Sequence, residues 1–318
     1  MTGKVLRIGT RASALALWQA RHVEALIGAL ADAPAVELVP IVTTGDLQTQ
    51  VPLWAVRGRA FFTKELDRAL LDGRIDLAVH SLKDLTTELE PGLALAAVLE
   101  REDPLDALVS QQGVPLAALA AGARVGTSSL RRRAFLARVR PDLHLLELRG
   151  NVPTRIERLE RGEYDAIVLA AAGLKRLGLE ARISERLSPE DFPPAVSQGA
   201  IGICTRERDA DTRAWVSRLE HGPTRLAATA ERALLRRIEG GCQVPLGALA
   251  RLEGTELRLR AVVCALDGRS SLTAAGTASA AGGTEARALG ERLAEALIAQ
   301  GASRLIAAQR AAQQDANA

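Results

Sequence analysis

The chain has 318 residues, of which 47% are hydrophobic and 25% are charged, and its net charge is +3. That length allows two or three domains with well-buried cores, and the composition is typical of a soluble globular protein. The small net charge argues against a protein that binds bulk polyanions, and the 3% of aromatic residues argues against stacking on nucleic-acid bases.

Short apolar runs alternate with longer helical patterns, which is typical of α/β architecture. In chain order we expect a strand at 5–9, a helix at 13–30, a strand at 36–43, a mobile loop over 44–60, a helix at 62–71 and a strand at 75–80.

The same plan then follows a second time. The sequence Ile-Gly-Thr at 8–10 is echoed by Val-Gly-Thr at 125–127, and each marks a strand end that turns into a helix start. The segment 73–79 is echoed by 162–168, and each is a strand that follows a helix. Because the order is the same in both halves, we infer two similar lobes that face a cleft, although such short echoes also arise by chance in βα sequences.

A strand expected at 195–205 returns to the first lobe, and from residue 222 the pattern changes. We expect a helix at 224–238, antiparallel strands at 246–250, 256–265 and 271–278, a helix at 284–300 and a frayed tail after 307. The sequence therefore predicts three domains: a first α/β lobe (1–99 with 200–218), a second α/β lobe (100–199) and a smaller α+β domain (219–318).

Arginine supplies 37 of the 41 basic residues, because the chain has only four lysines. A GC-rich genome explains most of this bias, but arginine also offers a fixed fork of donors for carboxylates and phosphates. The cysteines Cys204, Cys242 and Cys264 cannot all pair and lack metal-ligand spacing, so no metal site is expected. With no signal-peptide core and no apolar run that could span a membrane, we expect a reduced, cytoplasmic protein.

Hydroxyl and basic side chains gather where predicted strands end and helices begin. Such a set at a helix start, with the unpaired N–H groups and the helix dipole, favours an anion site, although a plain N-cap before a solvated basic face is the alternative. The candidates in the second lobe are Thr127, Ser128, Ser129, Arg131, Arg132, Arg149, Arg155 and Arg176.

Arg155 falls in a first helical turn, where a cation opposes the dipole and so indicates a nearby anion. Arg11 and Ser13 hold the equivalent place in the first lobe. Open α/β sheets bind ligands at the carboxyl ends of their strands, so we expect a ligand with several carboxylates or phosphates. Neither a phosphate loop nor a dinucleotide motif occurs in the sequence, which disfavours nucleotides.

Asp84 is the exception among these cations. It follows a predicted strand directly after Lys83, and it either pairs with a neighbouring cation or meets an N–H donor or a developing positive charge on the substrate. His80, in the same segment, is interpreted as a packed strand residue.

Cys242 follows two glycines and precedes a Gln-Val-Pro turn, whereas a structural cysteine usually sits inside an apolar run. This geometry suits a thiol that is presented to a ligand.

Together these motifs resemble the porphobilinogen deaminase family, whose members are hydroxymethylbilane synthases. The resemblance runs in register from about residue 5 to about residue 305. Five segments carry it: Arg-x-Ser at 11–13, His-Ser-Leu-Lys-Asp at 80–84, Val-Gly-Thr-Ser-Ser-Leu-Arg-Arg at 125–132, Leu-Arg-Gly-Asn at 148–151 and Glu-Gly-Gly-Cys-Gln-Val-Pro at 239–245.

The resemblance implies two lobes with mixed sheets like those of periplasmic binding proteins, a third domain with the cysteine loop, and a monomer. It implies a transferase of porphyrin and haem biosynthesis, which deaminates four porphobilinogen molecules and joins them head to tail into a linear tetrapyrrole, released by water as hydroxymethylbilane. It also implies a dipyrromethane cofactor held by a thioether to Cys242.

The resemblance further assigns roles to individual residues. Asp84 would hold the pyrrole N–H groups, stabilise the azafulvene cation and help to move protons, and Phe62 would stack on or shield the reacting pyrroles. The acetate and propionate groups would be bound by Arg11, Ser13, Lys83, Thr127, Ser128, Ser129, Arg131, Arg132, Arg149, Arg155 and Arg176.

The chain departs from the family pattern at four positions. Ala60 and Ser197 replace glycines, Thr86 stands where proline is common, and Cys204 stands where an acid is expected. If position 197 needs a positive φ, Ser197 costs roughly 1–2 kcal/mol of strain.

Three other functions compete with an active deaminase. The lobes and their arginines would suit a solute-binding receptor, the arginine run at 131–133 suggests a nucleic-acid binder, and Ala60 with Ser197 suggests an impaired deaminase. The lack of an export signal and the Cys242 domain count against the receptor, and the small net charge and few aromatic residues count against the nucleic-acid binder. None of the departures falls on Cys242, Asp84 or the main arginines, which favours the active enzyme.

Overall fold

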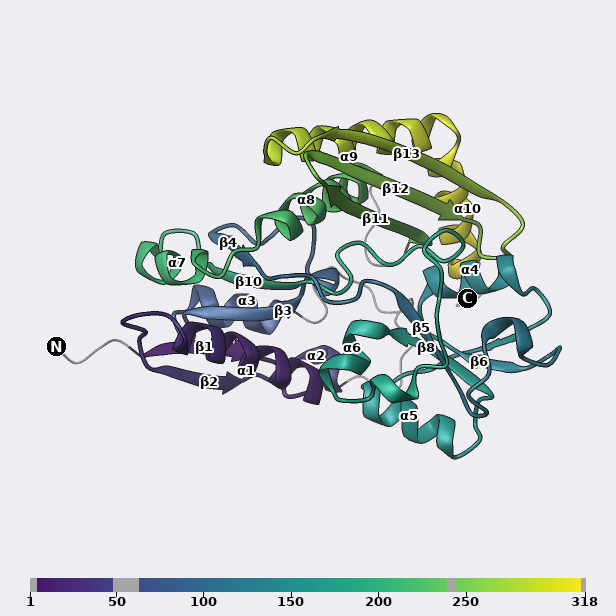
Figure 1. Ribbon diagram of the computed structural model, residues 1–318, viewed down its shortest axis with the longest axis horizontal. Coiled ribbons are helices and arrows are strands. Elements are labelled where there is room, and N and C mark those ends of the chain that lie inside the picture. The colour runs from purple at the N-terminus through teal and green to yellow at the C-terminus, as the bar shows by residue number, and fades with distance from the viewer. Residues whose placement is uncertain (1–4, 48–62, 239–243, 316–318) are drawn as a thin grey trace.

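The computed structural model describes residues 5–47, 63–238 and 244–315, and for residues 46–47 and 309–315 it describes the backbone alone. Two five-stranded sheets and one three-stranded sheet organise this part of the chain (Figure 1). Among the described residues, no helix has both the length and the apolarity that crossing a membrane requires.

The first lobe is built on a mixed sheet in which three parallel strands are followed by one strand that runs antiparallel to both of its neighbours. The edge strand beyond it runs parallel to the first three. In sheet order the strands are β2 (Val36–Pro40), β1 (Leu6–Thr10), β3 (Leu77–Ser81), β10 (Ile201–Arg206) and β4 (Leu93–Val98). Its helices are α1 (Ala14–Gly28), α2 (Thr44–Leu47), α3 (Lys64–Leu71) and α7 (Ala210–Ser217), and the 3₁₀ turn η2 (Leu82–Asp84) follows β3 directly. The predicted return of a late strand to this lobe is confirmed, because β10 pairs with both β3 and β4.

The second lobe repeats this arrangement with its own strands. In sheet order these are β7 (His144–Leu146), β6 (Arg124–Gly126), β8 (Ala166–Ala170), β5 (Asp106–Ser110) and β9 (Glu185–Arg186). Its helices and 3₁₀ turns are η3 (Leu116–Ala118), α4 (Leu130–Val139), α5 (Val152–Glu160), α6 (Ala171–Arg176) and η4 (Glu180–Arg182). The predicted internal repeat is therefore confirmed, since β1 and β6 hold the same place in their sheets, as do β3 and β8.

Glycine is required in both copies of the repeated strand-end sequence because a neighbour packs against the backbone there. A Cβ on Gly9 would lie 2.2 Å from Cδ1 of Ile75, and one on Gly126 would lie 2.8 Å from Cδ1 of Tyr164. No real Cβ makes such contacts, so each strand packs tightly only without a side chain at this point.

The third domain is an antiparallel sheet covered by helices, as predicted. Its strands are β11 (Leu246–Glu253), β12 (Glu256–Cys264) and β13 (Ser271–Ser279), and its helices are α8 (Gly222–Arg237), α9 (Gly283–Ala299) and α10 (Ala302–Asp315). Helices α8 and α9 cross closely, because a Cβ on Gly290 would lie 2.1 Å from the carbonyl oxygen of Ala230. In Figure 1 this domain lies across the two lobes, and α8 leads into it from the first lobe.

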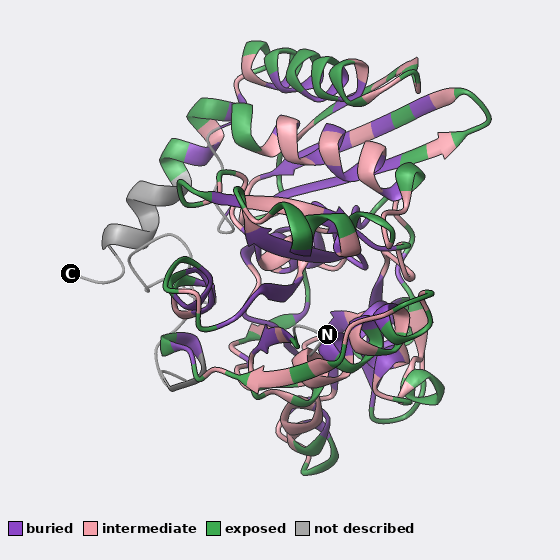
Figure 2. Ribbon diagram, turned by 90° about the vertical axis from the view of Figure 1, so that its left-hand side faces the viewer, coloured by how far each residue is buried: buried purple, intermediate pink, exposed green. Residues whose placement is uncertain are grey.

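Two crossover segments join the lobes. One, residues 99–105, leads from β4 to β5, and the other, residues 187–200, leads from β9 back to β10. Figure 2 shows that the central strands are buried while the outer turns of the helices are exposed. The predicted fold class, two α/β lobes with mixed sheets and a smaller α+β domain, is confirmed by this topology.

Three local predictions were wrong or too long. The tail after 307 is not frayed, because α10 continues to Asp315. Part of the loop expected over 44–60 is helical, as α2, and the rest lies outside the described residues. The strand expected from 195 begins only at Ile201, because Ser197 adopts a φ of 61° and Gly199 one of 90°, which no strand contains.

Ser197 occupies the left-handed region that the sequence analysis anticipated, and this generates a prediction for stability. Its side chain is fully buried and its hydroxyl has no hydrogen-bond partner among the described residues. Ser197→Gly should therefore raise the free energy of unfolding by about 1 kcal/mol, measured by urea denaturation. Ser197→Ala is the control, since it removes the buried hydroxyl but keeps the strain. Equal free energies of unfolding for Ser197→Gly and the parent protein would show that the backbone at Ser197 is not strained.

Candidate active site

The predicted site residues of the first lobe lie around the carboxyl ends of β1 and β3. A cavity of about 70 Å³ at this point is lined by Arg11, Ser13, Leu15, Ala16, Gln19, Thr63, Val79, His80, Ser81 and Asp84. Asp84 ends the η2 turn, and Ser13 is the N-cap of α1, whose hydroxyl accepts a hydrogen bond from the N–H of Ala16. The structure thus brings Asp84, Arg11 and Ser13 together at one opening.

Gln19 completes this wall and was not found from the sequence. It lies on the buried face of α1, and its Nε2 donates to the hydroxyl of Ser81 over 2.9 Å. A polar residue at a buried helical position was the only local signal.

His80 is a buried strand residue, as expected. Burial, together with the charge of Arg11, lowers its pKa to about 4, so its ring is neutral at pH 7.

The second lobe contributes a pair of guanidinium groups that share one buried carboxylate. Arg131 and Arg132, in the first turn of α4, are 5% and 6% exposed, and Asp106 at the start of β5 is fully buried. Nη2 of Arg131 lies 2.6 Å from one oxygen of Asp106, and Nε of Arg132 donates to the other over 2.9 Å. Burial alone would raise the pKa of Asp106, but the two guanidinium groups hold it below its ordinary value.

Asp106 was missed by the sequence analysis, although an acid at the head of a fully buried strand is unusual. Part of the donor capacity of Arg131 and Arg132 is used within the protein, by Asp106 and by backbone carbonyls. Nη1 of Arg131 donates to the carbonyl of Pro193, and Nη1 of Arg132 donates to that of Val168, each over 2.8 Å.

Lys83 reaches from the first lobe to this cluster. Its Nζ donates over 3.2 Å to the side chain of Gln198, whose Nε2 donates in turn to the carbonyl of Pro104. Burial lowers the pKa of Lys83 to about 8, and the charges of Arg132 and Arg131 act in the same direction against those of Asp84 and Asp106. Burial is therefore the main reason for the lowered pKa of Lys83, because the two carboxylates offset the two guanidinium groups.

Two further arginines extend this positive region. Burial, then the charges of Arg132 and Arg149, lower the pKa of Arg155 to about 10, and burial likewise lowers that of Arg149. Nε of Arg155 donates to the carbonyl of Gly150 over 2.7 Å, so part of this first-turn cation is satisfied by backbone.

The predicted hydroxyl groups largely build the start of α4. Ser129 is the N-cap, whose hydroxyl accepts from the N–H of Arg132, and Thr127 accepts from the N–H of Ser129. The hydroxyl of Ser128 donates to the carbonyl of Leu148 and is buried.

Arg176 lies where the lobes meet. Its Nη2 donates to the carbonyl of Gly199 over 2.6 Å, and its guanidinium carbon lies 5.7 Å from the ring centroid of Trp18 on α1. Trp18 also stacks on His22, with their ring centroids 5.1 Å apart. Arg176 therefore holds α6 against the first lobe.

Two predicted residues, Cys242 and Phe62, lie outside the described residues, as does Ala60. The other two cysteines are buried, which raises the pKa of Cys204 to about 12 and that of Cys264 to about 11. Both are thus protonated at neutral pH and unsuited to nucleophilic attachment.

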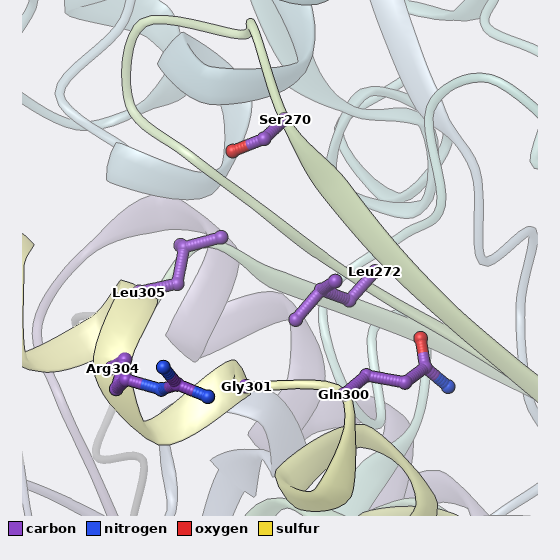
Figure 3. A pocket seen from close by; sticks show the side chains of 6 residues that line it. All are labelled: Ser270, Leu272, Gln300, Gly301, Arg304 and Leu305. Carbon is purple, nitrogen blue, oxygen red and sulfur yellow. The ribbon is translucent and has the colours of Figure 1, made fainter.

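A second cavity, of about 480 Å³, lies in the third domain and is lined by none of the predicted site residues. Figure 3 shows the residues that line it, from β13 and the loop before it, the junction of α9 and α10, and the start of α10: Ser270, Leu272, Gln300, Gly301, Arg304 and Leu305. Within the described part of the chain, no group of three or more His, Cys, Asp or Glu side chains could hold a metal ion.

Comparison with known families gives two matches that together span most of the chain. A family model described as the porphobilinogen deaminase dipyromethane cofactor binding domain matches residues 6–214, and one described as the porphobilinogen deaminase C-terminal domain matches residues 225–299.

Among solved structures, the VFT2 domain of Bordetella pertussis BvgS is 16% identical, with 68% of this chain and 86% of that chain covered and a TM-score of 0.39. The periplasmic aliphatic sulphonate binding protein SsuA of Escherichia coli is also 16% identical, with 73% and 70% covered and a TM-score of 0.39.

Asp106 should be essential to the second lobe because it alone separates the buried charges of Arg131 and Arg132. Asp106→Asn should lower the free energy of unfolding by about 3–5 kcal/mol, measured by urea denaturation at pH 7. Asp142→Asn is the matched control, since Asp142 pairs with Arg140 at the surface and its loss should cost much less. A loss for Asp106→Asn no larger than that of the control would show that the two arginines do not depend on Asp106.

Proposed function

This chain belongs to the porphobilinogen deaminase family, and we propose that the basic cleft between its lobes is where porphobilinogen is deaminated and polymerised. The protein is accordingly a transferase of tetrapyrrole biosynthesis with a dipyrromethane cofactor. Our finer proposal is an ammonia-releasing synthase that joins four porphobilinogen molecules head to tail and releases hydroxymethylbilane.

The observation that carries this proposal is the excess of positive charge in the cleft. Arg131 and Arg132 share the fully buried carboxylate of Asp106, and Lys83 lies close enough to it for their charges to interact. Arg155 in turn lies close enough to Arg132 for their charges to interact. Buried charge of one sign requires a partner of the other sign. Pyrroles that each carry an acetate and a propionate supply that partner, so the donor set fits both the cofactor and the growing chain.

When bound, the dipyrromethane supplies the primer from which the chain grows. We propose that Cys242 holds it through a thioether, because the segment with Cys242 follows α8 directly and the two described cysteines are buried and protonated. Arg11, Ser13, Arg149, Arg155 and Arg176 would then bind side-chain carboxylates at the cleft, while the α4 start with Thr127, Ser128, Ser129, Arg131 and Arg132 forms its fixed wall.

Asp84 is the proposed catalytic residue. Its carboxylate opens onto the cavity shared with Arg11 and Ser13, at the end of the rigid β3 strand. There it can accept hydrogen bonds from pyrrole N–H groups and stabilise the positive charge that develops on porphobilinogen as ammonia leaves. Phe62 keeps its proposed role as a stacking or shielding ring.

The remaining predictions are kept as proposals. The membership of β10 in the first sheet and of β5 in the second supports the predicted domain bounds of 1–99 with 200–218, 100–199 and 219–318. We further propose a monomer that works in the cytoplasm, with porphobilinogen as its substrate and without a nucleic-acid or membrane partner. The family match favours this activity over a solute-binding receptor or a nucleic-acid binder.

The first test is the intact mass of the purified protein under denaturing conditions. The parent protein should carry the added mass of two linked pyrroles, and Cys242→Ser should not, because the thioether has no other anchor. Cys264→Ser, which changes a buried thiol, should keep the added mass. An unmodified parent chain that also fails to gain pyrrole masses when porphobilinogen is added would overturn the proposal, whereas a loaded protein without product would identify an impaired deaminase.

The pKa of Lys83 predicts a pH dependence of substrate binding. Because that pKa is about 8, Lys83 is charged below pH 8 and loses its charge as the pH rises through that value. The KM for porphobilinogen should therefore rise roughly five- to tenfold between pH 7 and 9. Lys83→Arg stays charged over this range, so its KM should rise less. The ratio of the KM of the parent protein to that of Lys83→Arg, taken at each pH, cancels the titration of the substrate. A ratio that stays constant from pH 7 to 9 would contradict the binding role of Lys83.

A further inference from the structure

The turn that presents Asp84 is held from outside the first lobe. On the side of the sheet, the N–H of Leu82 donates to the carbonyl of Ala200 over 3.0 Å. On the opposite side the carbonyls before and after Asp84 are bound by one side chain of the third domain, that of Arg232 on α8. Its guanidinium donates to the carbonyl oxygens of Leu82, Leu85 and Thr86 over 3.5, 3.1 and 2.5 Å.

This arrangement uses properties that only arginine has. The planar fork presents five donors in fixed directions, and these span three carbonyls of one turn, whereas an ammonium group is a compact point donor. Since these three acceptors are backbone carbonyls, the contact with the turn does not depend on the side chains of the turn. It survives the replacement of the common proline by Thr86 for that reason.

The preceding residue fixes α8 to the two crossover segments. Glu231 is fully buried, and its carboxylate accepts from the N–H of Ser197 over 2.6 Å and from Nη1 of Arg101 over 2.6 Å. It also accepts from the N–H of Ala250 in β11. Glu231 therefore prevents α8 from sliding against the lobes, and Arg232 extends from this fixed point to the turn.

We propose that Arg232 is a positioning residue for the reaction: it sets the height and angle at which the Leu82–Asp84 turn offers Asp84 to the substrate. The inference rests on the proposed role of Asp84. The helix that carries Arg232 also leads in the sequence to the proposed anchor, Cys242, which follows ten positions later.

The test compares Arg232→Lys and Arg232→Gln with Arg236→Gln. Arg236 lies one turn further on the same helix and makes an exposed ion pair with Glu88, so it controls for a lost charge on α8. For each protein the denatured intact mass gives the fraction that carries the cofactor, and kcat is expressed per loaded molecule. We expect both Arg232 variants to load the cofactor, to lose roughly 10–100-fold in kcat and to keep KM within about twofold, with the control unchanged.

A second measurement separates positioning from a general structural role. If Arg232 acts through Asp84, then Arg232→Lys should have little further effect in an Asp84→Glu background, where the carboxylate is already displaced. Independent losses in the double variant, a kcat within twofold of the parent, or an Arg232→Lys protein that does not fold would each overturn the assignment. A parent protein that neither loads the cofactor nor turns over would instead remove the proposed function, and this inference with it.

Discussion

The cleft depends on one buried carboxylate. Asp106 lies between Arg131 and Arg132, whose guanidinium groups would repel each other if it were absent. Because a carboxylate has two oxygens, each arginine takes one and keeps its remaining donors for backbone carbonyls or a ligand. The result is a wall that is rigid, since its members are buried, and still positively charged, since two cations share one anion. Rigid charge that needs no reorganisation is the most effective way to bind a succession of carboxylates.

A second constraint decides how this wall meets the first lobe. Both crossover segments contact Glu231, through Arg101 in one and Ser197 in the other. The lobes are thus joined by two short connections that share an anchor in the third domain, and Arg176 adds a contact with Trp18 of the first lobe. Lys83 can reach Gln198 only because this geometry is fixed. The proposed elongation of a chain between the lobes needs such an arrangement, in which the charges stay in place while the occupant changes.

Features that depend on neighbouring residues could be predicted from the sequence, whereas contacts between residues far apart in the sequence could not. Strands, helices and the lobe repeat were predictable because their signals are local: Gly126 must be a glycine, and Ser129 caps the helix that follows it. The residues that were missed act on distant partners. Gln19 bonds to Ser81, 62 positions away, and Arg232 to Thr86, 146 positions away. No periodicity or cap signal reports such pairs, so Asp106 and Gln19 read as ordinary polar residues until the fold brings their partners together.

Ser197 shows how the same constraint tolerates an unfavourable residue. Its φ of 61° is costly for any side chain but glycine, and its buried hydroxyl adds to that cost. Yet its N–H donates over 2.6 Å to Glu231. A charge-assisted hydrogen bond to a fully buried carboxylate contributes more than the backbone strain costs, so the turn keeps its shape whichever residue occupies it. The conformation at the crossover is therefore set by the third domain rather than by the residue at 197. The substitution should then affect the stability of the protein more than the geometry of its cleft.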